Sequence, residues 1–209
     1  MTWDVVLGSA SPARLGLLRS AGIDPRVMTA EVDEDGIAAA WDPADPAGLV
    51  QALADAKSVA VLRDRAPDPG TIVITADSLF VFDGQVLGKP GRADIARQRL
   101  TELAGQAGDL FTGHTAVIVD DSGQHRHVRG VARTEVRFAD FTAAELDSYI
   151  ATGEPLAVAG GFTLDGLASP FISGITGDPS NVIGLSMPLL RRLLADAGIF
   201  WPDLWDLTG

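Results

Sequence analysis

The sequence predicts an α/β protein built on a mixed β-sheet. Apolar, β-branched segments that fit buried strands alternate along the 209 residues with segments that fit helices, an order typical of α/β folds. Two long extended segments, 110–119 and 125–138, flank a turn sequence at 120–123, so they are expected to form an antiparallel hairpin. A hairpin implies a sheet that is not fully parallel. No repeat, low-complexity tract or linker divides the chain cleanly, so one domain is expected over 1–209.

The chain begins with a predicted strand over 5–7 that leads through Gly8 and a Ser-rich turn into a helix. Pro12 suits the first position of that helix, where its missing N–H costs nothing, and Gly22 ends it. The free N–H groups at such a helix start point at the preceding turn, where an anion can sit. A second strand is expected over 26–29.

The middle of the chain is predicted to place an acidic residue beside a central strand. The expected elements are an acidic turn at 31–35, a helix from 46 to about 65, a strand over 71–75, an extended segment over 79–82, a turn at 88–91 and a helix over 93–103. Asp77 follows the β-branched strand directly, at its carboxyl end. Ligands of α/β proteins bind at the carboxyl ends of strands, so this position is a candidate for function.

The last third of the chain is predicted to contain two helices and a loop. Thr142 is followed three residues later by Glu145, a capping-box pattern that marks the start of a helix. A flexible, ligand-sized loop is expected over 159–166, and a long final helix over 179–197.

Composition narrows the classes of function. Hydrophobic residues make up 46% of the chain and charged residues 21%, a balance typical of globular proteins. The formal net charge of -12 repels nucleic acids and anionic membranes, so neither is an expected partner. The absence of cysteine excludes disulfides and thiol catalysis within the chain. No signal peptide or membrane span is recognisable, and a cytoplasmic location is expected.

The sequence lacks the common nucleotide and hydrolase motifs: a Gly-x-x-x-x-Gly-Lys-Ser/Thr loop, a Gly-x-Gly-x-x-Gly turn between strand and helix, and a Gly-x-Ser-x-Gly elbow. What remains is a set of polar residues near the ends of predicted elements. They are Ser9, Ser11, Arg14, Glu34, Lys57, Asp77 and Lys89. Hydroxyl and N–H groups bind phosphate oxygens, cations stabilise charge on a polyphosphate, and carboxylates bind a divalent cation or accept a proton from water. These residue types are the ones that hydrolysis of a phosphoanhydride needs.

Four of these residues also have a structural interpretation. Asp77 alone fits a turn or a helix cap, and Glu34 fits a solvated acidic turn. Lys57 fits an exposed helix lysine, and Ser11 fits an N-cap, a role that is compatible with contact to a phosphate.

The sequence resembles the Maf-like (septum formation inhibitor) family of nucleotide pyrophosphatases over nearly its whole length. The matching segments are 7–14 (LGSASPAR), 32–34 (VDE), 53–57 (LADAK), 76–78 (ADS), 87–90 (LGKP), 149–155 (YIATGEP), 159–162 (AGGF) and 177–185 (GDPSNVIGL). Each is weak evidence by itself, whereas eight in the same order are specific.

The resemblance implies an elongated mixed sheet with helices around it and a cleft between two lobes. It also implies a nucleoside triphosphate substrate, a divalent cation such as Mg²⁺ or Mn²⁺, and a homodimer. Carried over position by position, the family's site residues are its catalytic acidic residue at Asp77, a second acidic residue at Glu34, two lysines at Lys57 and Lys89, two serines at Ser9 and Ser11, and an arginine at Arg14. The divalent cation would be bound by Glu34 and Asp77.

The sequence departs from the family pattern at several positions. Ala13 replaces the first of two paired arginines, which removes one contact to phosphate or base. Ser78 keeps the hydroxyl of a threonine that often follows the catalytic aspartate, and it is a candidate substrate contact. Asp165, another candidate, stands where the branch acting on thymidine and uridine triphosphates has glutamine. A carboxylate only accepts hydrogen bonds, which weakens the transfer of that branch's pyrimidine preference to this chain. A histidine usual in the family is Gly108 here, and no role is assigned to His114.

Two functions follow from this pattern. The first is an enzyme that hydrolyses a nucleoside triphosphate to the monophosphate and pyrophosphate, with water attacking the α-phosphorus. The alternative is a nucleotide-binding regulator of cell division without significant turnover. Because binding alone does not require a specific pair of acids, the presence of Asp77 and Glu34 together with both lysines favours the enzyme.

Overall fold

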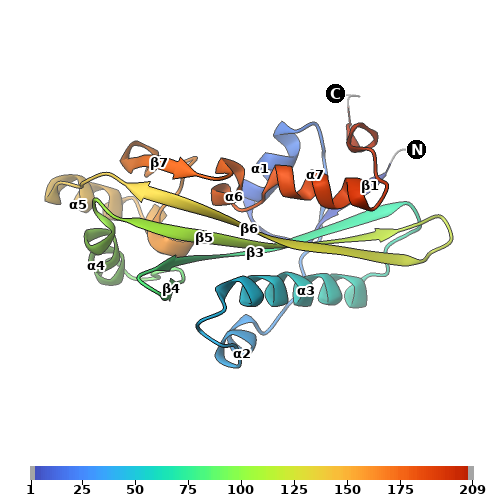
Figure 1. The fold of residues 1–209 in the computed structure, drawn as a ribbon, viewed down its shortest axis with the longest axis horizontal. Coiled ribbons are helices and arrows are strands. Elements are labelled where there is room, and N and C mark those ends of the chain that lie inside the picture. The colour runs from blue at the N-terminus through green and yellow to red at the C-terminus, as the bar shows by residue number, and fades with distance from the viewer. Residues whose placement is uncertain (1–2, 207–209) are drawn as a thin grey trace.

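The computed structural model describes residues 3–206, and within them one seven-stranded sheet runs along the longest axis of the molecule (Figure 1). The strands are β1 (Asp4–Leu7), β2 (Arg26–Val27), β3 (Thr71–Phe82), β4 (Gln85–Leu87), β5 (Ala107–Val119), β6 (His125–Phe138) and β7 (Ile172–Thr176). They follow the order β2-β1-β3-β5-β6-β7, with β4 paired to one end of β3. β1 is parallel to β2 and β3, whereas the other pairs are antiparallel, so the predicted mixed sheet is confirmed.

Helices cover both faces of the sheet. They are α1 (Pro12–Ser20), α2 (Glu34–Ala39), α3 (Pro46–Asp64), α4 (Ala93–Leu103), α5 (Ala143–Ala151), α6 (Pro179–Ile183) and α7 (Met187–Asp196), with short 3₁₀ helices η1 (Glu154–Ala157), η2 (Ala159–Gly161), η3 (Ser169–Phe171) and η4 (Trp201–Leu204). α3 lies against one face, and α1, α6 and α7 lie against the other (Figure 1). Within the described residues, none of these helices is long and apolar enough to cross a bilayer.

The alternation of side chains along β3 decides which helices each of its residues meets. Ile72 and Ile74 pack in one buried cluster with leucines of α1 and α7, whereas Val73 packs in another cluster that includes Val61 of α3. Successive side chains of a strand point to opposite faces. An odd-numbered residue of β3 such as Asp77 therefore faces α3, and an even-numbered one faces α1.

A second large cluster fills the other end of the sheet, beneath α4 and α5. Its centre is three phenylalanine rings, Phe80, Phe138 and Phe162, whose centroids lie 4.9–6.0 Å apart in edge-to-face contacts. Such pairs contribute about 0.5–1.5 kcal/mol beyond the burial of their surface. Phe162 belongs to the loop after η2, so this packing anchors that loop to the sheet.

The central strand differs from the sequence-based prediction. A strand over 71–75 that ends before Asp77 is wrong, because β3 continues without a break to Phe82. β5 pairs with β3 continuously from Thr71 to Val81, which keeps the backbone extended past the polar residues. Asp77 therefore lies inside a strand rather than after one.

Two helices also differ from the prediction. The acidic segment at 31–35 is only partly a turn, because Glu34 is the first residue of α2. The single helix predicted over 179–197 is two helices, α6 and α7. Gly184 adopts a φ of 126° that ends α6, and the side chain of Ser186 then caps α7.

Other elements match the prediction closely. The helix over 93–103 and the strand over 125–138 have the predicted bounds, and the capping box of Thr142 and Glu145 is present at the start of α5. The short strands β4 and β7 were not predicted. The loop expected over 159–166 begins with the turn η2, in which Gly160 is buried.

Candidate active site

The candidate site lies at a gap in the edge of the sheet. β1 pairs with β3 only as far as Ile74, and β4 pairs with the same edge only from Phe80 onward. Among the described residues, no strand covers β3 over 75–79 on this edge. An extended backbone that is open on one edge can be reached from both faces of the sheet, and a cavity occupies this position.

The cavity has a volume of about 1070 Å³, which suits a ligand larger than a single phosphate. Its lining comes from the turn before α1, from α2 and α3, from the middle of β3, and from segments at 88–89, 157–165 and 182–184. All nine residues that the sequence predicted as site residues line it. They are Ser9, Ser11, Arg14, Glu34, Lys57, Asp77, Ser78, Lys89 and Asp165.

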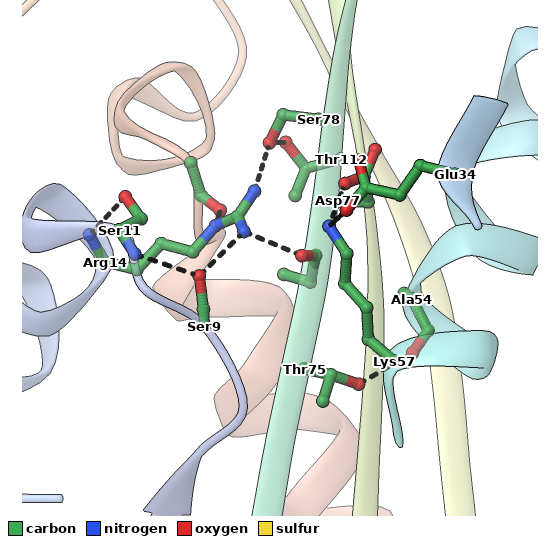
Figure 2. Close-up of polar contacts among 12 residues, drawn as sticks. Ser9, Ser11, Arg14, Glu34, Ala54, Lys57, Thr75, Asp77, Ser78 and Thr112 are labelled. Carbon is green, nitrogen blue, oxygen red and sulfur yellow. Dashed lines mark hydrogen bonds and ion pairs between the residues drawn. The ribbon is translucent and has the colours of Figure 1, made fainter. Parts of the chain in front are cut away.

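Lys57, Asp77 and Glu34 form an ion-paired cluster on the α3 side of β3 (Figure 2). The Nζ atom of Lys57 lies 2.5 Å from Oδ1 of Asp77 and 2.9 Å from Oε1 of Glu34. The side chain of Asp77 is nearly buried, with 11% of its surface exposed, whereas that of Glu34 is 53% exposed at the start of α2. One ammonium group therefore joins a buried carboxylate to a carboxylate at the mouth of the cavity.

Helix α3 is held in the register that this contact needs. The hydroxyl of Thr75 donates a hydrogen bond of 2.8 Å to the backbone oxygen of Ala54, less than one turn before Lys57. Thr75 and Asp77 share one face of β3, so the same strand fixes both the helix and the carboxylate (Figure 2). The bond places the lysine opposite the aspartate.

Arg14 lies on the other side of β3 (Figure 2), and its guanidinium group is buried and bound by the protein itself. Its Nε donates to the oxygen of Gly184 at 2.8 Å, and Nη1 donates to the oxygen of Ala76 at 2.7 Å and to Oγ of Ser9 at 3.1 Å. Nη2 donates to Oγ of Ser78 at 3.0 Å. Burial lowers the pKa of Arg14, while the charges of Asp77 and Glu34 oppose that shift.

This geometry gives Arg14 a different role from the one that the resemblance implies. Four of the five N–H groups of a guanidinium are used in bonds to the protein, including one to the Ala76 carbonyl on the open edge of β3. Arg14 thereby joins α1, β3 and the end of α6, so it builds the wall of the cavity more than it offers donors to a ligand.

The two serines shape the turn before α1. Ser11 is the N-cap of the helix, and its hydroxyl accepts the N–H of Arg14 at 3.4 Å. Ser9 accepts the N–H of Ser11 at 3.2 Å. Both serines line the cavity, and a hydroxyl whose oxygen accepts bonds from N–H groups can still donate its hydrogen to a phosphate oxygen.

Among the predicted site residues, Lys89 and Asp165 are the two whose side chains the described part of the protein leaves unbonded. Within residues 3–206, neither side chain has a hydrogen bond or an ion pair, and both are exposed. The turn that carries Lys89 is itself fixed, because the oxygen of Gly88 accepts a bond of 2.7 Å from Arg99. Lys89 is therefore a free cation on a rigid support.

Sequence reasoning missed two residues that support the lining of the cavity without being part of it. Thr112 on β5 pairs its hydroxyl with that of Ser78 at 2.9 Å, and Glu154 supports the loop that forms one wall. Glu154 stands within a segment of the family resemblance, which was the signal available for it. Nothing in the sequence marked Thr112, because its partner lies on another strand.

His114 lies outside the lining of the cavity. Its ring is fully buried between β5 and α7. Nδ1 lies 3.0 Å from the oxygen of Thr112, and Nε2 accepts the N–H of Ser186 at 2.7 Å. Burial and the charge of Arg14 lower the pKa of His114 to about 4, so the imidazole is neutral at pH 7.

Glu34 and Asp77 are the carboxylates predicted to bind a divalent cation. Among the residues that the structure describes, no group of three or more acidic or imidazole side chains forms a metal site. Mg²⁺ in phosphate-binding sites is commonly held by one or two carboxylates together with the phosphates of the substrate. The pair therefore fits an ion that arrives with a polyphosphate, rather than one held by the protein alone.

Known proteins resemble this chain over nearly its full length. A protein with 50% identity over 202 residues, covering 96% of both chains, is a nucleoside triphosphate pyrophosphatase of Saccharopolyspora erythraea. A second, of the same name and from Streptomyces coelicolor, is 51% identical over 201 residues, which cover 96% of this chain and 94% of the other. Residues 4–197 match the family described as Maf-like protein. The chain therefore belongs to the Maf-like family.

Proposed function

We propose that this protein is a nucleoside triphosphate pyrophosphatase that hydrolyses its substrate to a nucleoside monophosphate and pyrophosphate. The observation that carries the proposal is the ion-paired cluster of Lys57, Asp77 and Glu34 in a cavity lined by every predicted site residue. The names of two relatives that share half of the sequence support the same activity.

The phosphates fit the end of the cavity that carries hydroxyl and ammonium groups. Ser9 and Ser11 lie at the start of α1, where backbone N–H groups favour an anion. Lys57 and Lys89 approach from α3 and from the turn after β4. Their charges would stabilise the negative charge that develops on the departing pyrophosphate.

Asp77 is the proposed proton acceptor for the attacking water. Its carboxylate is nearly buried, and Lys57 holds it in one orientation through a bond of 2.5 Å. A carboxylate in a fixed position beside the α-phosphorus could remove a proton as water attacks. Glu34 and Asp77 would hold the divalent cation, Mg²⁺ or Mn²⁺, which when bound supplies charge stabilisation to the phosphates.

The same features bear on partners and location. A net charge of -12 disfavours contact with nucleic acid or an anionic membrane, so we propose a small-molecule substrate in the cytoplasm. We further propose a single domain, since one sheet contains every strand from β1 to β7, and a homodimer, as the family resemblance implies. Analytical ultracentrifugation would test the dimer, which should sediment with twice the chain mass of 21.8 kDa.

A panel of canonical and modified nucleoside triphosphates with Mg²⁺ tests the activity, with pyrophosphate and monophosphate measured together. At least one nucleotide should yield both products in equal amounts. Asp77→Asn should reduce turnover by a factor on the order of 100 or more while nucleotide binding persists.

Asp55→Asn is the matched control for that variant. Asp55, on α3, resembles Asp77 in being a partly buried carboxylate, but it binds Thr115 and Arg129 outside the cavity. This variant should keep its activity. Binding of nucleotides without any product would instead support a nucleotide-binding regulator, and full activity of Asp77→Asn would remove this residue from the mechanism.

A further inference from the structure

Glu154, at the start of η1, binds a loop that the proposed chemistry does not use. Its Oε1 accepts the hydroxyl of Thr163 at 2.5 Å and the hydroxyl of Tyr149 at 3.1 Å. The N–H of Leu167 lies 3.1 Å from both carboxylate oxygens. One carboxylate thus joins α5 to both ends of the segment 163–167.

The segment bound in this way packs closely around the carboxylate. A Cβ atom added to Gly166 would lie 2.9 Å from Oε2 of Glu154 and 2.4 Å from the hydroxyl of Thr163. Burial by itself would raise the pKa of Glu154, but the bonds from Thr163, Leu167 and Tyr149 outweigh it and lower the pKa below its usual value. Glu154 is therefore ionised at neutral pH, where it accepts these bonds as a carboxylate.

The same loop forms a largely apolar wall of the cavity, to which it also contributes Thr163 and Asp165. Phe162 and Leu164 line the cavity together with Leu79, Val86 and Val158. The charged and hydroxyl groups that suit phosphates come from the turn before α1, from α3 and from β3. A flat, largely apolar heterocycle fits the wall, since apolar contact favours it there.

We propose that Glu154 is a positioning residue that fixes the wall against which the nucleobase of the substrate lies. The inference rests on the proposed function and adds the part of the cavity that holds the base. Glu154 has no contact with the phosphate end, because its bonds go to the loop and to α5. Its loss should affect recognition of the base and leave the phosphate chemistry intact.

The test compares a nucleoside triphosphate, which has a nucleobase, with inorganic tripolyphosphate, which has none. Glu154→Ala should raise KM for the preferred nucleoside triphosphate by about tenfold, with kcat within about threefold of the parent. The inhibition constant of inorganic tripolyphosphate, measured as a competitive inhibitor with Mg²⁺, should stay within about twofold. Glu145→Ala is the control, because the Glu145 carboxylate also accepts hydrogen bonds but caps the start of α5 and has none to the loop 163–167.

Three outcomes would overturn the inference: unchanged KM, a loss confined to kcat, or equal losses for the nucleotide and for tripolyphosphate. If Glu154→Ala does not fold, Thr163→Val removes one bond from the loop side and should weaken nucleotide binding in the same selective way. Should the parent protein hydrolyse no nucleotide, the proposed function fails. Calorimetric dissociation constants for the nucleotide and for tripolyphosphate would then still decide the role of Glu154.

Discussion

Arg14 and Lys57 lie on opposite sides of β3, and their bonding partners show that Arg14 is structural whereas Lys57 belongs to the chemistry of the site. Arg14 is buried and uses its donors on the oxygens of Gly184, Ala76 and two serines, so its removal would leave several polar groups without partners. Within residues 3–206, the ammonium group of Lys57 binds only the carboxylates of Asp77 and Glu34, at the cavity. The two residues have the same charge, but Arg14 stabilises the fold around the cavity, whereas Lys57 orients the carboxylates of the site.

Arg14→Lys should destabilise the protein by about 2–4 kcal/mol, because an ammonium group cannot reproduce four bonds that diverge from a planar guanidinium. Urea denaturation monitored by circular dichroism would measure the change in the free energy of unfolding. Arg19→Lys is the control, since Arg19 lies on the same helix and forms an exposed pair with Asp24. That control should change stability by less than about 0.5 kcal/mol, and an equal effect of both substitutions would contradict the structural role of Arg14.

The residues of the site could be predicted in part from the sequence. Asp77, Glu34 and Lys57 were identified by the family resemblance, and the structure brings them into contact. The internal bonding of Arg14 could not be predicted, because it depends on the open edge of β3. The residue at which each strand stops pairing with its neighbour depends on packing across the whole sheet. Local sequence patterns do not contain that information.

At the scale of elements, helices and strands with a long sequence pattern were predicted correctly, whereas short strands and the break between two helices were not. The helix over 93–103 and the strand over 125–138 were predicted with their bounds, because each has a long periodic or extended pattern. β2, β4 and β7 are short strands of two, three and five residues. β4 and β7 were not predicted, because their extended form depends on their partner strands. The division between α6 and α7 depends on a single glycine conformation.

The contact between β5 and α7 should make stability sensitive to pH through His114. Its pKa falls from an ordinary value of 6.5 to about 4 in the fold, so between these values the unfolded chain binds a proton that the folded chain does not. Stability therefore falls as the pH falls, by about 2 kcal/mol from pH 7 to pH 5 from this residue alone.

The variant His114→Gln removes the titrating ring while its amide oxygen can still accept the N–H of Ser186. Free energies of unfolding at pH 7 and pH 5, from urea titrations, should differ less in this variant than in the parent. His125→Gln is the control, since His125 is exposed at the end of the hairpin, and it should keep the slope of the parent. Parallel slopes for all three proteins would show that His114 is not the titrating group.

At the scale of the whole molecule, one sheet runs through the described residues, and the site lies at the gap between β1 and β4, where the edge of β3 has no neighbouring strand. The two large apolar clusters lie toward opposite ends of the sheet, with the cavity between elements that belong to both. Stability comes from these clusters, and the described chain has no metal site of three or more ligands that would add to it.

Removal of divalent cations should therefore abolish turnover and leave the fold intact. Thermal unfolding in excess chelator and in Mg²⁺ should give melting temperatures within about 2 °C of each other in the absence of nucleotide. Nucleotide and Mg²⁺ together should raise the melting temperature, because the ion and the phosphates bind as one ligand. A shift of more than about 5 °C on chelation alone would indicate a metal held by the protein itself.

The central claim is that water attacks the α-phosphorus of a nucleoside triphosphate beside Asp77. The most direct measurement is hydrolysis of the preferred nucleotide in water enriched in oxygen-18, with the products separated and analysed by mass spectrometry. The label should appear as one oxygen in the nucleoside monophosphate, with none in pyrophosphate. Label in pyrophosphate, or orthophosphate as the first product, would contradict attack at the α-phosphorus.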